Sequence, residues 1–177
     1  AQQDNFSKIP GAPVAYWVSE NFIIAFDKGL MIGSISNVSE GIKTGNNERF
    51  LRLWHEVNKD GFSFENCAKK SKWYPHHKGG EFRKWYGNKT WVINWENDGK
   101  EIKHEVNSGL QGQIMYFKEF ISWSKISSKG NPMRYFQKGN LFDSGAPALN
   151  NKLLKETLGF FNGKVGSYYL SVLSPTI

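Results

Sequence analysis

Residues 90–99 read TWVINWENDG, a run that alternates in strand fashion and then enters a turn signal. Trp91, Ile93 and Trp95 fall on one face of an extended chain, because successive side chains of a strand point to opposite faces. The residues Asn97-Asp98-Gly99 favour a tight turn, since Asn, Asp and Gly tolerate a left-handed backbone. The stretch therefore predicts a strand followed by a sharp reversal.

Patterns on either side place further strands in the middle of the chain and helices near both ends. Ser19 is a candidate N-cap for a helix over 20–28 that ends at Gly29. We also expect strands over 32–36, 116–126, 133–136 and 141–142, an extended segment over 49–57, and a helix over 151–173. This order predicts an α+β fold, with a central, mostly antiparallel or mixed β-sheet region flanked by N-terminal and C-terminal helices. A length of 177 residues with 39% hydrophobic residues fits a single domain over 1–177.

The net charge of +7 is concentrated in one segment. Between Lys69 and Lys89 there are seven Lys or Arg residues and one acid, Glu81. Such a balance favours an anionic partner, nucleic acid first and a membrane surface second. No run approaches 18 consecutive apolar residues, so no membrane span is predicted. A single cysteine, Cys67, builds no disulfide framework, and this favours a cytoplasmic protein.

The segment from Lys72 to Asn88 interleaves cations with aromatic side chains around a glycine pair. Lys and Arg neutralise phosphates, and glycine lets backbone N–H groups approach a phosphate closely. Trp and Tyr can stack on bases or pack beside sugars, whereas the alternative is a solvated basic loop anchored by its aromatics. The candidates for phosphate contact here are Lys72, Lys78, Gly79, Gly80, Arg83 and Lys84. The candidates for aromatic stacking or packing are Trp73, Tyr74, Trp85 and Tyr86.

A second polar loop, GIKTGNN at residues 41–47, suits hydrogen bonding to phosphates or base edges. It lacks the Gly-Lys-Ser/Thr of a Walker loop, and an ordinary turn is the alternative. Lys43 and Gly45 are candidates for phosphate contact. Amide side chains suit adenine and arginine suits guanine. The base-reading candidates over both loops are Thr44, Asn46, Asn47, Arg83 and Asn88.

Motifs that would carry chemistry are absent from the sequence. There is no Gly-x-Gly-x-x-Gly, no Gly-x-Ser-x-Gly and no tetrapeptide of the Asn-Pro-Pro-Tyr type. His76 and His77 lack a third ligand at a useful spacing, so structural or phosphate-contacting roles are favoured over a metal site. We therefore expect no catalytic residue, no cofactor and no metal within these 177 residues.

Four motifs, in order along the chain, resemble a known family. Residues 41–54, GIKTGNNERFLRLW, are similar to the Gly-x-x-Thr-Gly-x-Asn-x-x-Phe loop of TaqI-like specificity domains. Residues 72–99 resemble BREX phage-defence methyltransferases of the PglX type more closely. ISWSKIS at 121–127 resembles a strand of that family, and FFNGKV at 160–165 resembles one of its helices, with Phe161 and Gly163 in place of the usual Leu and Ser. The match covers roughly residues 9–177.

This resemblance implies a target-recognition domain that binds double-stranded DNA for an adenine-specific DNA methyltransferase of a phage-defence or restriction-modification system. The parent enzyme would transfer a methyl group from S-adenosylmethionine to adenine N6, with its catalytic domain upstream of residue 1. The implied partners are DNA, that domain and other phage-defence subunits. The specificity domain of a fused type II restriction-modification enzyme is an alternative.

Two rivals come from other functional classes. A carbohydrate-binding module would use Trp73, Trp85, Trp91 and Trp95 as stacking platforms, and would not need the basic cluster. A nuclease fragment would need grouped carboxylates to hold a metal, and the acids of this chain are scattered.

Overall fold

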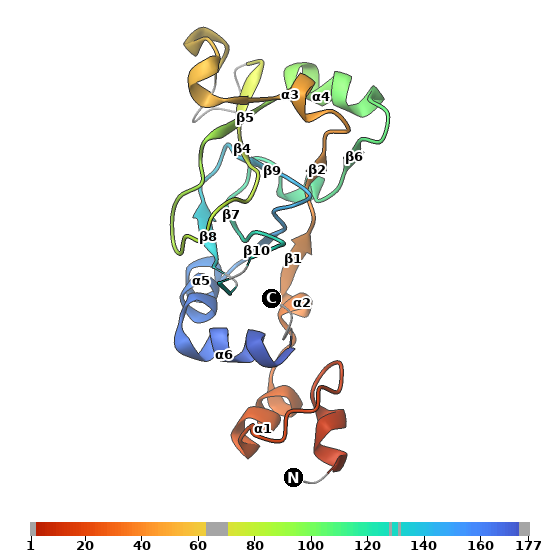
Figure 1. The fold of residues 1–177 in the computed structure, drawn as a ribbon, viewed down its shortest axis with the longest axis vertical. Coiled ribbons are helices and arrows are strands. Elements are labelled where there is room, and N and C mark those ends of the chain that lie inside the picture. Colours follow the sequence, from red (N-terminus) through yellow and green to blue (C-terminus); the bar gives the residue numbers. More distant parts are fainter. Residues whose placement is uncertain (1–2, 63–70, 128, 131, 174–177) are drawn as a thin grey trace.

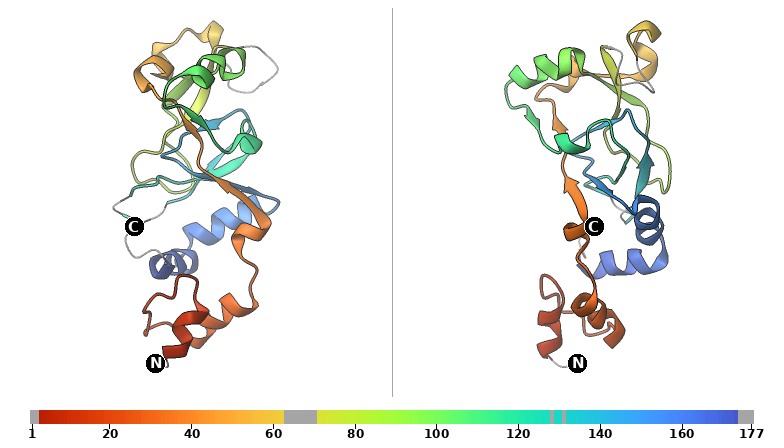
Figure 2. Two further views of the ribbon diagram at one scale, coloured as in Figure 1. Left: turned by 90° about the vertical axis from the view of Figure 1, so that its right-hand side faces the viewer. Right: turned by 180° about the vertical axis from the view of Figure 1, so that it is seen from behind.

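The computed structural model describes residues 3–62, 71–127, 129–130 and 132–173. They form an elongated arrangement with a small N-terminal lobe, residues 3–28, at one end (Figures 1 and 2). Cys67, Lys69 and Lys70, on which the cysteine and charge predictions partly rest, lie outside the described residues.

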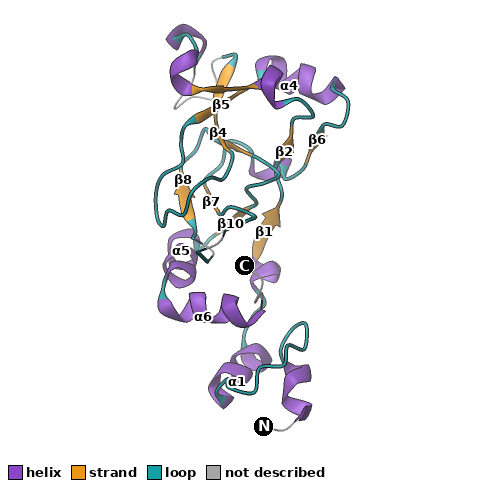
Figure 3. Ribbon diagram, in the orientation of Figure 1, coloured by secondary structure: helices purple, strands orange, loops and turns teal. Residues whose placement is uncertain are grey.

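Helices gather near both ends of the chain and beside the central sheets (Figure 3). The α-helices are α1 (Glu20–Lys28), α2 (Ile32–Ile35), α3 (Asn47–Phe50), α4 (Glu96–His104), α5 (Leu154–Asn162) and α6 (Lys164–Leu173). The 3-10 helices are η1 (Gln3–Lys8), η2 (Trp54–Glu56), η3 (Lys59–Gly61) and η4 (Gln113–Met115). The predicted helix over 20–28 is confirmed, and the Ser19 hydroxyl accepts a hydrogen bond from the backbone N–H of Phe22 at 3.3 Å.

Within the described ranges, the strands are short and form three sheets. They are β1 (Ser36–Ser39), β2 (Ile42–Lys43), β3 (Leu51–Leu53), β4 (Trp73–His77), β5 (Trp91–Asn94), β6 (Gly109–Leu110), β7 (Phe120–Ser122), β8 (Arg134–Phe136), β9 (Leu141–Phe142) and β10 (Ala148–Asn151). One sheet has the order β1-β10-β7-β8, a second β3-β5-β4-β9, and β2 pairs with β6. The pairing of β4 with β9 is parallel, and the other pairings are antiparallel. The predicted α+β class is confirmed.

The main core lies between the sheets and is rich in aromatic rings. Phe120 and Phe136 stack with ring centroids 5.1 Å apart, and Trp95 meets Tyr116 edge to face at 5.5 Å. Such ring pairs add roughly 0.5–1.5 kcal/mol each beyond the area they bury. A separate small cluster, made by Ile9, Ala15, Phe22 and Val172, joins the N-terminal lobe to α6.

Several predicted boundaries differ from the structure. The strand predicted over 32–36 is wrong, because residues 32–35 form the single turn α2 and the strand starts at Ser36. The turn closes when the backbone N–H and the hydroxyl of Ser34 both donate to the Met31 carbonyl, at 2.9 and 2.7 Å. The prediction of one continuous helix over 151–173 is also wrong. The structure has two helices, α5 and α6, which are separated at Gly163, where a side chain would crowd the carbonyls of Gly159 and Phe160.

Other strands are shorter than predicted. The segment 49–57 contributes only β3, between α3 and η2, and the segment 116–126 contributes only β7. The strand over 90–95 is confirmed as β5, and Asn97, Asp98 and Gly99 adopt left-handed backbone angles as the turn signal predicts.

Candidate nucleic-acid interface

The basic loop, residues 78–89, begins at the end of β4 and has an irregular backbone. Positive φ angles occur at Gly79, Gly80, Trp85, Gly87 and Asn88. The φ of +71° at Trp85 is uncommon for a bulky residue, so the surrounding structure must hold it in place. The loop therefore has a defined conformation that contacts with the rest of the protein maintain.

A buried arginine stabilises the basic loop through hydrogen bonds to its backbone carbonyls. Arg134 on β8 is fully buried, and its Nη1 donates to the carbonyl of Arg83 at 3.1 Å. Its Nη2 donates to Ser124 Oγ at 3.0 Å, and Ser124 Oγ donates to the carbonyl of Gly80 at 2.9 Å. Burial lowers the pKa of Arg134 to about 10, so the side chain stays protonated at neutral pH. One buried cation thus fixes the loop at two points.

The four aromatic candidates divide into two pairs. Tyr74 is buried in the core and Trp73 is half-buried beside it on β4. Trp85 pairs its backbone with β8, since its N–H donates to Met133 at 2.9 Å and its carbonyl accepts from Tyr135 at 3.0 Å. This leaves the Trp85 indole about half exposed, and the neighbouring Tyr86 ring is more exposed still. Of the four candidates, Trp85 and Tyr86 are therefore the most exposed rings.

The cations near the basic loop have different surroundings. Arg83 is exposed, with its guanidinium 4.0 Å from the exposed carboxylate of Glu81. Lys78 lies over the Trp91 ring, with Nζ 4.9 Å from the centroid. Lys72 lies 3.9 Å from Glu96. Lys84 instead donates to the carbonyl of Asn162 at 2.9 Å, so its ammonium ties the loop to the end of α5. Its phosphate role stays a prediction.

The second polar loop, residues 41–47, borders a pocket of about 210 Å³. Thr44 is buried, and its hydroxyl donates to Asn47 Oδ1 at 2.7 Å, which directs the Asn47 amide N–H groups away from Thr44. Asn46 Oδ1 caps α3 by accepting from the N–H of Arg49 at 3.1 Å. Lys43 and Gly45 are exposed at the rim. In the basic loop, Asn88 donates to the carbonyl of Glu81 at 2.9 Å.

Two residues that line this pocket, Asp143 and Ser144, are not among the site residues predicted from the sequence. They follow β9 and lie about 100 residues from the loop they face. His76 Nε2 lies 3.4 Å from Asp143 Oδ2, and the Gly145 N–H donates to Asp143 Oδ1 at 2.8 Å. Partial burial opposes ionisation of Asp143, but these hydrogen bonds and the nearby positive charge outweigh it and lower its pKa. An Asp directly after a short strand was the available signal.

The turn Asp143–Gly145 joins the two loops into one surface. The Asp143 N–H donates to the carbonyl of His77 at 2.9 Å, just before the basic loop. The Ser144 N–H donates to the carbonyl of Ile42, within the second polar loop, at 2.9 Å. A methyl group built on Gly79 would lie 3.5 Å from the Gly145 carbonyl. The two loops, which residues 48–77 separate in sequence, therefore flank one turn.

The two adjacent histidines lie in the interior of the protein. Both side chains are buried, and the His77 ring lies against Phe136 with centroids 4.1 Å apart. Burial, helped by the charges of Arg134 and His76, lowers the pKa of His77 well below 6.5. Over the described ranges, no three His, Cys, Asp or Glu side chains are placed to share a metal ion.

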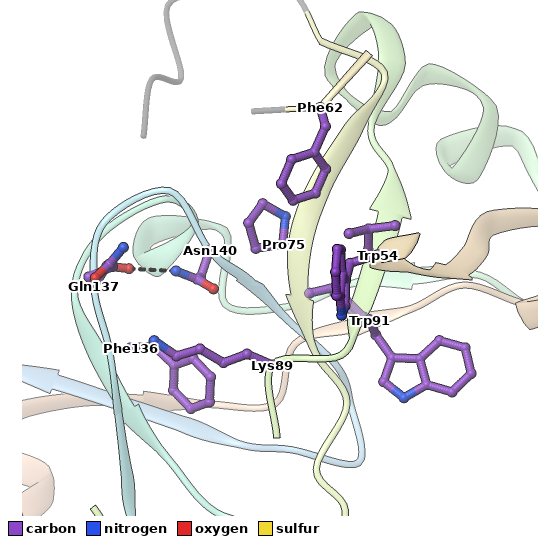
Figure 4. Close-up of a pocket in the computed structure, with 10 residues that line it drawn as sticks. Trp54, Phe62, Pro75, Lys89, Trp91, Phe136, Gln137 and Asn140 are labelled. Atoms are coloured by element: carbon purple, nitrogen blue, oxygen red, sulfur yellow. Dashed lines mark hydrogen bonds between the residues drawn. The ribbon is translucent and has the colours of Figure 1, made fainter. Parts of the chain in front are cut away.

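A smaller cleft of about 60 Å³ lies beside β4 and β5. Figure 4 shows Gln137 and Asn140 across this cleft from Trp54 and Trp91, and Asn140 Nδ2 donates to the Gln137 carbonyl at 2.9 Å. Its size accommodates a few water-sized groups. Trp95 is buried in the core, so the four tryptophans of the carbohydrate-binding alternative do not share a surface.

Comparisons with known proteins relate the chain to adenine-specific methyltransferases. It is 39% identical over 192 residues to the adenine-specific methyltransferase PglX of Lacticaseibacillus casei, and 41% identical over 182 residues to the adenine-specific methyltransferase BrxX of Escherichia coli. Each alignment covers 99% of this chain, which spans 16% and 15% of the length of these relatives. No model of a protein family matches the chain.

Within the described residues, no helix combines the length and apolar character needed to cross a bilayer. The resemblance to methyltransferases of the PglX type is confirmed at this level of identity. Nearly the whole chain corresponds to one segment of adenine-specific methyltransferases of the PglX and BrxX kind.

Proposed function

We propose that this chain binds double-stranded DNA and reads its sequence, as the target-recognition domain of an adenine-N6 DNA methyltransferase in a phage-defence system. The observation that carries the proposal is the joining of two polar loops by the turn Asp143–Gly145. One loop carries exposed cations and rings, and the other borders a polar pocket. Phosphate contact and base reading need these two kinds of surface side by side.

The two loops would have different roles, because they carry different chemical groups. Lys43, Lys78 and Arg83 supply positive charge for phosphates, and the exposed rings of Trp85 and Tyr86 supply stacking surface. Asn47 offers amide N–H donors beside the Asp143 carboxylate, so the pocket presents donors and an acceptor to a base edge. Arg134 keeps the basic loop in one conformation before DNA arrives, which lowers the entropic cost of binding.

The chemical step would belong to the rest of the parent polypeptide. The relatives named as methyltransferases are about six times longer than this chain, judged from the 15–16% that it covers. S-adenosylmethionine and the extruded adenine would be held by residues outside these 177, and this chain would set which adenine is reached.

A charge-matched comparison tests DNA binding. We expect the triple variant Lys43→Ala/Lys78→Ala/Arg83→Ala to weaken binding of a duplex containing the methylated site and to reduce the slope of log affinity against log salt by about 3. The control Lys152→Ala/Lys155→Ala/Lys164→Ala removes the same charge from exposed positions near and on α5 and α6. Equal losses in both variants would mean that net charge alone matters, which contradicts this interface.

A further inference from the structure

An exposed apolar segment connects the N-terminal lobe to the sheets. The side chains of Leu30, Met31, Ile32 and Ile35 are 81%, 56%, 37% and 45% exposed. The segment continues into β1, whose Val38 is about half exposed. We refer to residues 30–38 as the apolar connector. Connectors between packed units are ordinarily rich in polar residues, Gly and Pro, so this run of exposed apolar side chains is unusual.

The strand at the end of the apolar connector is also open on one side. In the described part of the chain, β1 is the outer strand of its sheet and pairs only with β10. An outer strand leaves backbone N–H and C=O groups available for pairing, and proteins ordinarily protect such an edge with charged side chains or a covering segment. β1 contains Ser36, Asn37, Val38 and Ser39, none of them charged.

The N-terminal lobe beyond the apolar connector is weakly held. Among the described residues, its cluster has four buried side chains, one of which, Val172, belongs to α6, and the other hydrophobic side chains packed against it are only partly buried. Two neighbouring rings of the lobe, Tyr16 and Trp17, are 70% and 58% exposed. A unit with so few buried side chains gains little stability from its own core. The lobe and the apolar connector therefore expose apolar side chains of the kind that are usually buried, and no described segment of the chain covers them.

DNA does not suit this surface. Between Ile9 and Ser39 the charged residues are Glu20, Asp27 and Lys28, which sum to −1 (one base against two acids). Protein–DNA interfaces are polar and strongly positive, whereas permanent protein interfaces are apolar at their centre. Because this segment has a slightly negative net charge, it is a poorer candidate for DNA binding than the basic loop.

We propose that the apolar connector is the surface on which the methyltransferase domain of the same polypeptide docks. This inference rests on the proposed function. A domain that reads DNA can select one adenine only if it is held rigidly relative to the catalytic domain, since a misplacement of about 1 Å is costly to catalysis. An apolar, well-packed contact gives such rigidity, whereas polar contacts between domains permit relative motion.

Hydrogen–deuterium exchange tests the docking directly. We compare the 177-residue chain with the intact polypeptide that contains it, and expect the amides of residues 30–39 to exchange about tenfold more slowly, or slower still, in the intact polypeptide. Equal exchange in the two samples would overturn the proposal. Light scattering on the 177-residue chain gives a further outcome. A dimer that Leu30→Ser/Met31→Ser dissolves would identify a second copy as the occupant and would also overturn it.

Variants separate docking from DNA binding. Leu30 and Met31 project into solvent, so Leu30→Ser/Met31→Ser is expected to leave the fold and the salt-dependent DNA binding of the 177-residue chain unchanged. In the intact polypeptide the same change is expected to reduce site-specific methylation about tenfold. The matched control Ile126→Ser/Val165→Ser alters two exposed apolar side chains outside the connector and outside both polar loops, and is expected to have no effect.

The outcomes distinguish the two proposals. If neither the unaltered chain nor the intact polypeptide binds DNA, the proposed function fails, whatever the exchange pattern. If DNA binding and methylation are normal and the Leu30→Ser/Met31→Ser variant methylates as fast as the unaltered protein, the docking proposal fails alone.

Discussion

The basic loop and the apolar connector are both exposed, yet they are held in opposite ways. The basic loop is fixed by a buried polar network, in which Arg134 and Ser124 bind the carbonyls of Arg83 and Gly80. The apolar connector is held by one local turn at Ser34 and by the pairing of β1 with β10. The charged surface has its internal support, whereas the apolar surface has little.

This difference bears on how each region would bind its proposed partner. Exposed charges are well solvated, so the basic loop needs no cover, and its network serves to fix its shape before binding. Exposed apolar side chains cost free energy in water, roughly 25 cal/mol for each Å² that a partner would bury. The apolar connector therefore stands to gain far more stability from association than the basic loop does.

The largest expected effect follows from removing the support of the basic loop. Arg134→Ala leaves two carbonyl or hydroxyl acceptors without their donor and opens a cavity at a fully buried position. We expect a loss of about 4 kcal/mol in the free energy of unfolding, measured by urea denaturation. Ser124→Ala, which removes one link of the network, should cost about 1 kcal/mol. Similar losses in the two variants would show that Arg134 does not organise the loop.

Loss of a ring in the N-terminal lobe should act locally. Phe22 stacks on Tyr169 with centroids 4.2 Å apart and belongs to the small cluster that attaches the lobe to α6. We expect Phe22→Ala to cost about 3 kcal/mol of local stability, seen as faster amide exchange in residues 9–28. The urea midpoint of the remaining chain and its DNA affinity should not change. A lower midpoint for the whole chain would mean that the lobe and the sheets unfold together.

Local patterns predicted those parts of the fold that depend on neighbours in sequence. The cap at Ser19, the strand at Trp91–Asn94 and the turn at Asn97-Asp98-Gly99 follow from side-chain type and spacing. The strand β4 was missed, because its residues WYPHH carry a proline and two histidines and read as part of a basic loop. Its burial arises from pairing with β5 and β9, which no local pattern contains.

The candidate site was predictable only in its exposed half. Composition identified both polar loops, and their positions are consistent with the proposed interface. Asp143 and Ser144 reach the pocket through the parallel pairing of β4 with β9, and Arg134 reaches the basic loop through β8. These contacts span 51 to about 100 residues, so only the tertiary structure reveals them. The same limit applies to Lys84, whose contact with Asn162 spans 78 residues.

Acid should weaken the structure around the basic loop through His77. Burial, with Arg134 and His76 nearby, lowers the pKa of His77 well below the 6.5 of an unfolded chain. Between these two values the unfolded state binds a proton that the folded state does not. The contribution of His77 to the free energy of unfolding is therefore complete above pH 6.5. It is lost as the pH falls below 6.5, by up to about 1.4 kcal/mol per pH unit. Urea denaturation at pH 7.0, 6.0 and 5.5 measures this slope.

A variant assigns that slope to its residue. His77→Phe keeps a ring beside Phe136 and removes the titrating group, so its stability should vary less over the same pH range. An unchanged slope would place the titration elsewhere.

The smallest expected effect concerns the ion pair between Lys72 and Glu96. The atoms are 3.9 Å apart and both side chains are about half exposed, so solvent screens the pair. Lys72→Ala should therefore change the free energy of unfolding by less than about 0.5 kcal/mol. Because the fold is expected to tolerate this change, any weakening of duplex binding would report a lost phosphate contact, with a salt slope reduced by about 1. If Lys72→Ala leaves both the DNA affinity and the salt slope unchanged while Lys78→Ala reduces them, the proposed DNA-binding charge begins at the basic loop and does not include Lys72.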